Sequence, residues 1–126
     1  MKTVAISATG ENPDASVDQR FGLARFFILL DPLTQDWELF DNLANITSME
    51  NVGIHTAKSL TKNQVETVIT GNCGSRAFKE LLESGVEVFL DAHGTVRQAF
   101  DQWRHGKPQP ASDANMVVFP QCDDQG

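Results

Sequence analysis

An uninterrupted apolar run, Phe26 to Leu30 (FFILL), constrains the fold of this chain more than any other feature. The run has the length of a strand, and the lack of polar alternation is typical of a strand covered on both faces. Asp31-Pro32 ends it, because this pair favours a turn. Trp37 to Asp41 then predicts the return strand of a hairpin. We therefore expect a sheet with layers packed on either side.

Strand and helix signals alternate along the rest of the chain, separated by polar connections such as residues 42–51. Ser48 and Asn51 are two candidate caps for the first helix, and Ser75 and Thr95 are placed to cap the next two. The order β-β-β-α-β-α-β-α predicts an α/β fold with three layers, a mixed five-stranded sheet and helices on both faces. The predicted strands cover residues 3–8, 26–30, 37–41, 65–70 and 86–90. The first predicted helix follows Ser48 or Asn51 and runs to about Lys62, the second runs from Ser75 until Gly85 ends it, and the third runs from Thr95 to Gly106.

The composition and charge bound the domain organisation and exclude some partners. The chain has 126 residues and a net charge of −7, whereas nucleic-acid binding needs a basic footprint. No stretch approaches the roughly 20 apolar residues of a membrane span, and Val4 to Ile6 is too short for a signal-peptide core. We expect one domain over residues 1–106, a flexible tail over 107–126, and a cytoplasmic protein that binds neither nucleic acid nor membranes.

The turn Gly71 to Arg76 (GNCGSR) is the sharpest local signal, because it follows a strand and opens a helix. Backbone N–H groups freed by the glycines, the helix N-terminus and the Arg76 guanidinium would together favour an anion. Cys73 could gain a lowered pKa there and ligate a metal. The alternative is a plain turn without a ligand. The two cysteines and three scattered histidines show no zinc spacing.

Two further segments belong at the same edge of the predicted sheet. Arg20-Phe21-Gly22 and Arg25 precede the buried strand, and His93 follows the last strand. Ligands of open α/β sheets gather at the carboxyl ends of the strands, so we interpret these residues as additional positive charge and donors. His93 is also a candidate metal ligand. Solvated arginines, a packing Phe and an ordinary loop histidine are the alternatives.

The element order also fits a ribonuclease-H-type fold, which makes nuclease activity an alternative. That chemistry needs carboxylates that converge on two metal ions. The first predicted strand carries none, and neither does Val68-Ile69-Thr70. No Ser/His/Asp or Cys/His pairing is evident, although Cys73 as a nucleophile stays an alternative. We therefore expect a binding protein rather than an enzyme.

An ordered set of motifs resembles the dinitrogenase iron–molybdenum cofactor biosynthesis family over roughly residues 2–107. The motifs are Arg20-Phe21-Gly22-x-Ala24-x-x-Phe27, Asn42 or Asn45, the turn from Gly71 to Phe78, Gly85-Val86-x-Val88, Gly94-Thr95-Val96 and Gly106. The resemblance implies a ribonuclease-H-like fold and binding of molybdenum- or iron-containing clusters or their precursors. In some small members it implies a molybdenum–copper sulfide cluster held without ordinary covalent ligands.

These observations predict a site for an anionic metal–sulfur cluster, either molybdenum–copper sulfide or an iron–molybdenum or iron–sulfur precursor. The three arginines would offset its charge, Phe21 would shield it from water, and a protein partner would exchange it. The runner-up is a non-metal module that binds a metabolite or a regulatory partner at the same face. The predicted site residues are Arg20, Phe21, Gly22, Arg25, Gly71, Asn72, Cys73, Gly74, Ser75, Arg76 and His93, with Cys73 and His93 as candidate metal ligands.

Overall fold

The computed structural model describes residues 3–48, 50–106 and 108–112. Most of the predicted tail, residues 107 and 113–126, therefore lies outside the described residues, and its predicted flexibility stays a prediction. The strands are β1 (Val4–Ala8), β2 (Phe26–Leu30), β3 (Trp37–Asp41), β4 (Thr67–Ile69) and β5 (Glu87–Phe89). The helices are α1 (Leu43–Ile46), α2 (Val52–Lys62), α3 (Ser75–Glu83) and α4 (Val96–Gly106).

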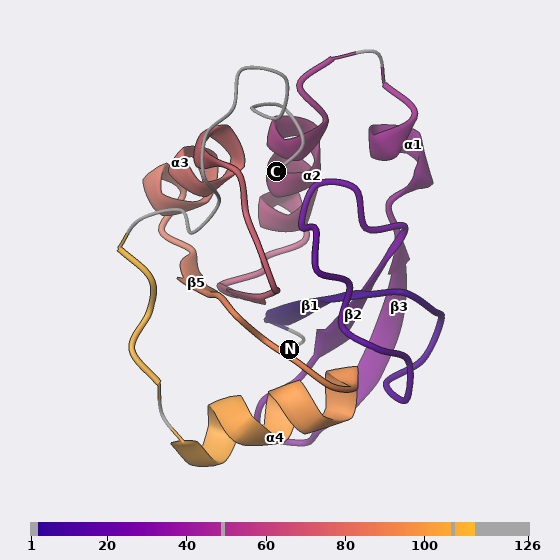
Figure 1. The fold of residues 1–126 in the computed structure, drawn as a ribbon, viewed down its shortest axis with the longest axis vertical. Coiled ribbons are helices and arrows are strands. Elements are labelled where there is room, and N and C mark those ends of the chain that lie inside the picture. Colours follow the sequence, from indigo (N-terminus) through magenta and orange to yellow (C-terminus); the bar gives the residue numbers. More distant parts are fainter. Residues whose placement is uncertain (1–2, 49, 107, 113–126) are drawn as a thin grey trace.

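The strands form one mixed sheet in the order β3-β2-β1-β4-β5. β1 pairs antiparallel with β2, which pairs antiparallel with β3, while β4 and β5 run parallel to β1. α2 and α3 cover one face and α4 covers the other (Figure 1). The prediction of a three-layer α/β fold with a mixed five-stranded sheet is confirmed.

Two apolar clusters fill the space on either side of the sheet. Successive residues of a strand face opposite sides, so Phe27 and Leu29 join the α2–α3 cluster while Ile28 and Leu30 join the α4 cluster. This division confirms that the apolar run of β2 is covered on both faces. Because β1, β4 and β5 run parallel, they end at one edge of the sheet, where three connections meet: residues 9–25, 70–74 and 90–95.

Some local predictions were wrong. Residues 42–51 are not a simple polar connection, because α1 forms there. Ser75 is the first residue of α3 rather than its cap, which is Gly74, whereas the Thr95 cap of α4 is confirmed by its bond to the Gln98 N–H (3.1 Å). β4 and β5 are also shorter than predicted. In the part of the chain that the structure describes, every helix is too short to cross a bilayer.

Candidate functional site

Gln19 holds the three connections at the carboxyl edge together. Its carbonyl accepts the Asn72 N–H (2.7 Å), and its side-chain Nε2 donates to the Ala92 carbonyl (3.0 Å). Gly71 passes so close that a Cβ on it would lie 2.9 Å from the Gln19 Cα and nearer still to its amide group. The edge is therefore a preformed unit in which Gly71 cannot carry a side chain without displacing Gln19.

Arg20 lies beside the glycine turn because its backbone forms a short parallel bridge with Asn72. Asn72 accepts the Phe21 N–H (3.0 Å), and the Arg20 N–H donates to Asp18 Oδ1 (3.0 Å). The Arg20 side chain is exposed and makes no hydrogen bond or ion pair to any described residue. The backbone of Arg20 is thus fixed beside the turn, while its guanidinium group is exposed at the surface.

The N-terminus of α3 is open. Its N-cap, Gly74, has an extended backbone (φ −68°, ψ 159°) and no side chain that could accept a hydrogen bond. Within residues 3–48, 50–106 and 108–112, the N–H groups of Gly74 and Ser75 have no acceptor. Unpaired amides at the positive end of a helix favour an anion.

The N-terminus of α4, at the same edge, is closed. Thr95 and Gln98 form a reciprocal capping box, in which the Thr95 N–H also donates to Gln98 Oε1 (2.9 Å). The next two amides are used by the 9–25 connection: Val96 N–H donates to Ala15 (2.8 Å) and Arg97 N–H donates to Pro13 (2.9 Å). The four amides from Thr95 to Gln98 therefore all have acceptors among the described residues.

Cys73 does not match its predicted role as a metal ligand with a lowered pKa. Its side chain is completely buried in the α2–α3 cluster, and burial raises the pKa of the thiol to about 12. The thiol therefore stays protonated near neutral pH, whereas metal ligation and nucleophilic attack both need the thiolate. Burial outweighs the helix N-terminus here, because the desolvation cost of the charged form is the larger effect.

Phe21 and Gly22 lie beneath the site rather than at its surface. The prediction that Phe21 shields a ligand is wrong, because its ring is completely buried and packs edge-on against Phe27 (5.4 Å between centroids). The connection that follows is held by a buried polar network. Asn42 Nδ2 donates to the Ala24 carbonyl (2.9 Å) and to Thr56 Oγ1 (3.0 Å), and Thr56 Oγ1 donates to the Gly22 carbonyl (3.2 Å).

Arg25 and Arg76 both lie at the edge but already have partners. Arg25 forms a two-pronged ion pair with Asp41 (2.8 and 3.1 Å), which raises the pKa of the guanidinium and lowers the pKa of the carboxyl group. Arg76, in the first turn of α3, donates from Nη1 to Asn51 Oδ1 (3.0 Å). Arg25 is thus charge-compensated, and Arg76 is oriented toward the start of α2.

His93 lies on the connection to α4 rather than on the open turn. It is exposed and lines a shallow hollow with residues of α4, including Asp101 and His105, on the side of the sheet opposite α3. The described residues contain no group of three or more His, Cys, Asp or Glu side chains that could hold a metal ion.

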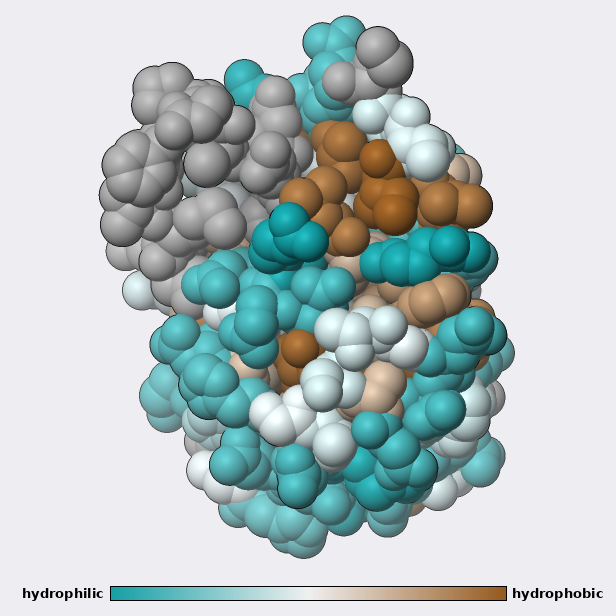
Figure 2. All heavy atoms as spheres, turned by 45° about the vertical axis from the view of Figure 1, so that its right-hand side comes forward, coloured by the Kyte–Doolittle hydropathy of each residue, from teal (hydrophilic) through white to brown (hydrophobic). Residues whose placement is uncertain are grey.

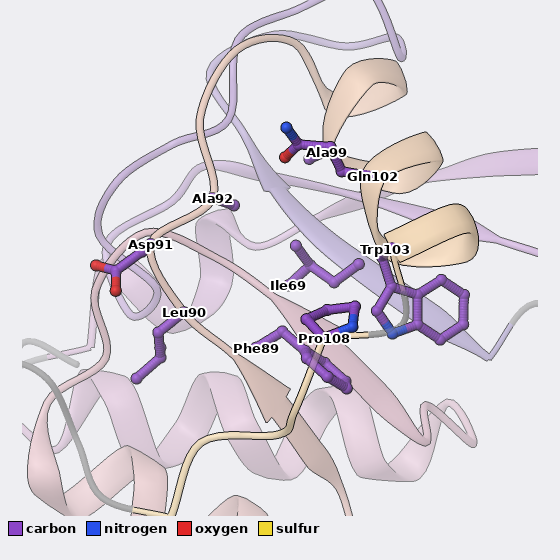
Figure 3. Close-up of a pocket in the computed structure, with 10 residues that line it drawn as sticks. Ile69, Phe89, Leu90, Asp91, Ala92, Ala99, Gln102, Trp103 and Pro108 are labelled. Atoms are coloured by element: carbon purple, nitrogen blue, oxygen red, sulfur yellow. The ribbon is translucent and has the colours of Figure 1, made fainter.

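An apolar hollow of about 360 Å³ lies between β5 and α4. Figure 3 shows the Trp103 indole beside Pro108, with Ile69 and Phe89 nearby and the Asp91 carboxylate pointing away from them. The one charged residue among its described lining residues is that aspartate. This hollow does not suit an anion and does not coincide with the open α3 turn.

Sequence reasoning missed Gln19 and Thr56. Both act through backbone carbonyls of segments far away in the chain, so no local motif marks them. Asn42 carried a signal only through the family motif, in which Asn42 and Asn45 were not distinguished. The structure shows that both take part, because Asn45 Nδ2 donates to Asn42 Oδ1 (2.8 Å).

The fold and the open, arginine-flanked helix N-terminus define a small α/β protein equipped to hold an anion at the edge of its sheet. A family model described as dinitrogenase iron-molybdenum cofactor matches residues 2–106, so the chain belongs to that family. This confirms the predicted family and associates the chain with the binding of metal clusters.

Two solved structures are similar over nearly the whole chain. The apo form of the orange protein from Desulfovibrio gigas is 36% identical, with 92% of this chain and 98% of that chain covered and a TM-score of 0.87. A Thermotoga protein described as a NifB protein of the DUF35 family is 29% identical, with 95% and 99% covered and a TM-score of 0.77. No curated protein matches the chain.

Proposed function

We propose that this protein binds and carries an anionic metal–sulfur cluster at the open N-terminus of α3. The observation that carries the proposal is the pair of amides at Gly74 and Ser75 for which no described residue is an acceptor. Arg20 adds to it, because its backbone is bridged to Asn72 in the same turn and its exposed guanidinium has no partner among the described residues. The family membership supports a metal cluster as the cargo. The net charge of −7 makes such a local positive site necessary for any anion.

The cluster would be held without protein ligands to its metals. Terminal sulfides would accept hydrogen bonds from the Gly74 and Ser75 amides, and Arg20 would contribute the largest compensating charge. Arg76 would add charge from the first turn of α3. Binding by outer atoms leaves the metals unligated by the protein, which suits a carrier that must release its cargo to a protein partner.

The cluster that we favour is molybdenum–copper sulfide, with an iron–molybdenum or iron–sulfur precursor as the alternative cargo. This choice rests on the family resemblance of the sequence motifs, which in some small members implies a molybdenum–copper sulfide cluster, and on membership of the iron–molybdenum cofactor family. We propose no catalytic activity for the chain. The buried, protonated Cys73 supplies no nucleophile, which argues against the enzyme alternative.

Reconstitution tests the proposal. The purified protein is mixed anaerobically with tetrathiomolybdate and Cu(I) and desalted, and its visible absorption and metal content are measured. We expect a stable chromophore with stoichiometric molybdenum and copper. Failure to retain these metals, and failure also with iron–sulfur precursors, would contradict the proposal.

A second candidate function is suggested by the apolar hollow between β5 and α4. Its volume of about 360 Å³ falls within the range of small-molecule sites, and its lining is mostly apolar. A regulatory module that binds a small uncharged ligand would use this hollow and not the α3 turn. Titration with a neutral aromatic probe, followed by Trp103 fluorescence in a Trp37→Phe background, separates the two functions.

A further inference from the structure

The exposed apolar side chains are concentrated at the β3 edge of the sheet. Of the five large hydrophobic residues that are exposed in the described chain, four belong to β3 or its immediate flanks: Leu33, Trp37, Leu39 and Leu43. The fifth is Leu82, on α3. Figure 2, which turns the β3 side forward, shows apolar atoms gathered toward the end where α1 lies, the helix that begins with Leu43. Such a concentration marks an interaction surface rather than scattered exposure.

The backbone of β3 shows what kind of partner fits this edge. The Asp31 N–H donates to the Asp36 carbonyl (2.9 Å), and the Asn42 N–H donates to the Arg25 carbonyl (2.7 Å). Together with the register of β2 and β3, these two bonds show which residues of β3 are hydrogen-bonded to β2 and which are not. Asp36, Glu38, Phe40 and Asn42 therefore direct their backbone groups to β2, and Trp37, Leu39 and Asp41 direct theirs outward.

No described residue hydrogen-bonds to those outward backbone groups. A row of unpaired donors and acceptors on an edge strand is completed by another strand. β3 has no proline or lysine to block such pairing, and its charged residues are Glu38 and Asp41.

We infer that two copies of this chain associate through β3, as an antiparallel pair centred on Leu39. In this register Leu39 faces the partner's Leu39 and Trp37 faces the partner's Asp41, and each facing pair exchanges two backbone hydrogen bonds. The outward backbone groups of Trp37, Leu39 and Asp41 are then all satisfied. Two five-stranded sheets become one continuous sheet.

The side chains of β3 are self-complementary in the same register. Glu38 faces the partner's Phe40, so no two carboxylates lie directly opposite one another. The charge of Asp41 is balanced by Arg25, so the partner's Trp37 can pack opposite it without facing an unpaired carboxylate. The same pairing brings Leu43, at the start of α1, toward the hairpin tip that carries the partner's Leu33, which is 90% exposed.

This association goes beyond the proposed cargo function and does not depend on it. β2 separates β3 from β1 and β4, so pairing through β3 leaves the α3 turn of each copy accessible. Because each copy carries a charge of −7, we expect association to strengthen as salt screens the repulsion.

Sedimentation velocity from low micromolar to near-millimolar concentration tests the inference, with Leu39→Lys as the test variant and Leu82→Lys as the matched control. The two leucines are similarly exposed (40% and 44%), and both variants change the net charge equally. We expect a monomer–dimer equilibrium for the wild type and Leu82→Lys. We expect at least about tenfold weaker association for Leu39→Lys, since like charges would face each other at the centre.

Hydrogen exchange at low and high protein concentration locates the contact. We expect the amides of Leu39 and Asp41 to become protected only at high concentration, while the Phe40 amide is protected at both. A wild type that stays monomeric at the highest concentration would overturn the inference. So would equal loss of association in the two lysine variants, or a dimer without new protection at Leu39.

Discussion

The two strand-to-helix turns at the carboxyl edge have the same position in the fold but opposite states. The turn from β5 to α4 uses its own capping box and two carbonyls of the 9–25 connection to satisfy the first amides of α4. The turn from β4 to α3 begins its helix at a glycine, which supplies no cap, and leaves the Gly74 and Ser75 amides without a described acceptor.

A helix N-terminus offers an anion hydrogen bonds only where the chain leaves its first amides unsatisfied. Both helices have a positive N-terminal end, but in α4 the capping box of Thr95 and Gln98 already provides hydrogen-bond partners for two of the amides there. The α3 turn also lies beside Arg20, which the bridge to Asn72 holds in place. For this reason we propose α3, and not α4, as the place where the cargo binds.

The largest effect is expected for Gly71→Ala, which breaks the α3 turn. The new Cβ would lie 2.9 Å from the Gln19 backbone, so the turn must move. We expect a loss of about 1–3 kcal/mol in the free energy of unfolding and loss of cluster retention. Chemical denaturation and metal analysis measure the two. Gly106→Ala is the control, because a Cβ there would meet nothing within 4 Å; similar behaviour of the two variants would contradict the close approach.

Ser75→Glu should convert the open turn into a closed one. The added carboxylate would occupy the positive end of α3, so we expect roughly tenfold weaker cluster retention together with unchanged or slightly higher stability. Gln98→Glu adds the same charge to α4 and preserves its capping box, so its retention should match the wild type. The comparison fails if the two glutamates weaken retention equally.

The arginines sharpen the comparison further. Arg20→Gln should weaken cluster retention several-fold, whereas Arg25→Gln should leave it unchanged, because Arg25 is already paired with Asp41. Removing Arg25 acts on acid stability instead. The Asp41 pKa is lowered by Arg25, so this pair stabilises the fold above the ordinary carboxyl pKa and loses that contribution as pH falls.

Acid unfolding curves of the Arg25→Gln variant measure this loss, and metal analysis measures retention in both arginine variants. Greater loss of cluster in Arg25→Gln than in Arg20→Gln would contradict this prediction, because the required positive charge would then come from Arg25.

Cys73 should have the smallest effect on the cargo. Cys73→Ala is expected to retain the cluster, because the buried thiol does not reach it. The pKa of about 12 also means that the folded chain keeps this proton after the unfolded chain loses its own. Stability should therefore fall as pH rises above about 8.5, and less so in the variant. Loss of the chromophore in Cys73→Ala would instead show that the thiol takes part in binding.

The sequence predicted the layers better than it predicted the surroundings of single residues. The apolar run of β2 has only one way to be buried on both faces, so the three-layer fold follows from it. The Arg25–Asp41 pair depends on the register of the β2–β3 hairpin, and the burial of Cys73 depends on how α2 and α3 pack. Neither is a local property of the chain.

The missed helix α1 shows the same limit. Asn42 and Asn45 are turn-forming residues, and their polarity indicated a connection. They form a helical turn because their amides bond to Ala24, Thr56 and Ser59 from distant segments. By contrast, the Thr95 cap was predictable, since its partner Gln98 lies three residues away.

Amide chemical shifts of the ¹⁵N-labelled protein, recorded before and after reconstitution with tetrathiomolybdate and Cu(I), test the assignment to α3 most directly. We predict that the Gly74 and Ser75 amides shift strongly and that the Val96, Arg97 and Gln98 amides do not. Shifts centred on His93 and α4, with Gly74 and Ser75 unchanged in a protein that retains the metals, would contradict it.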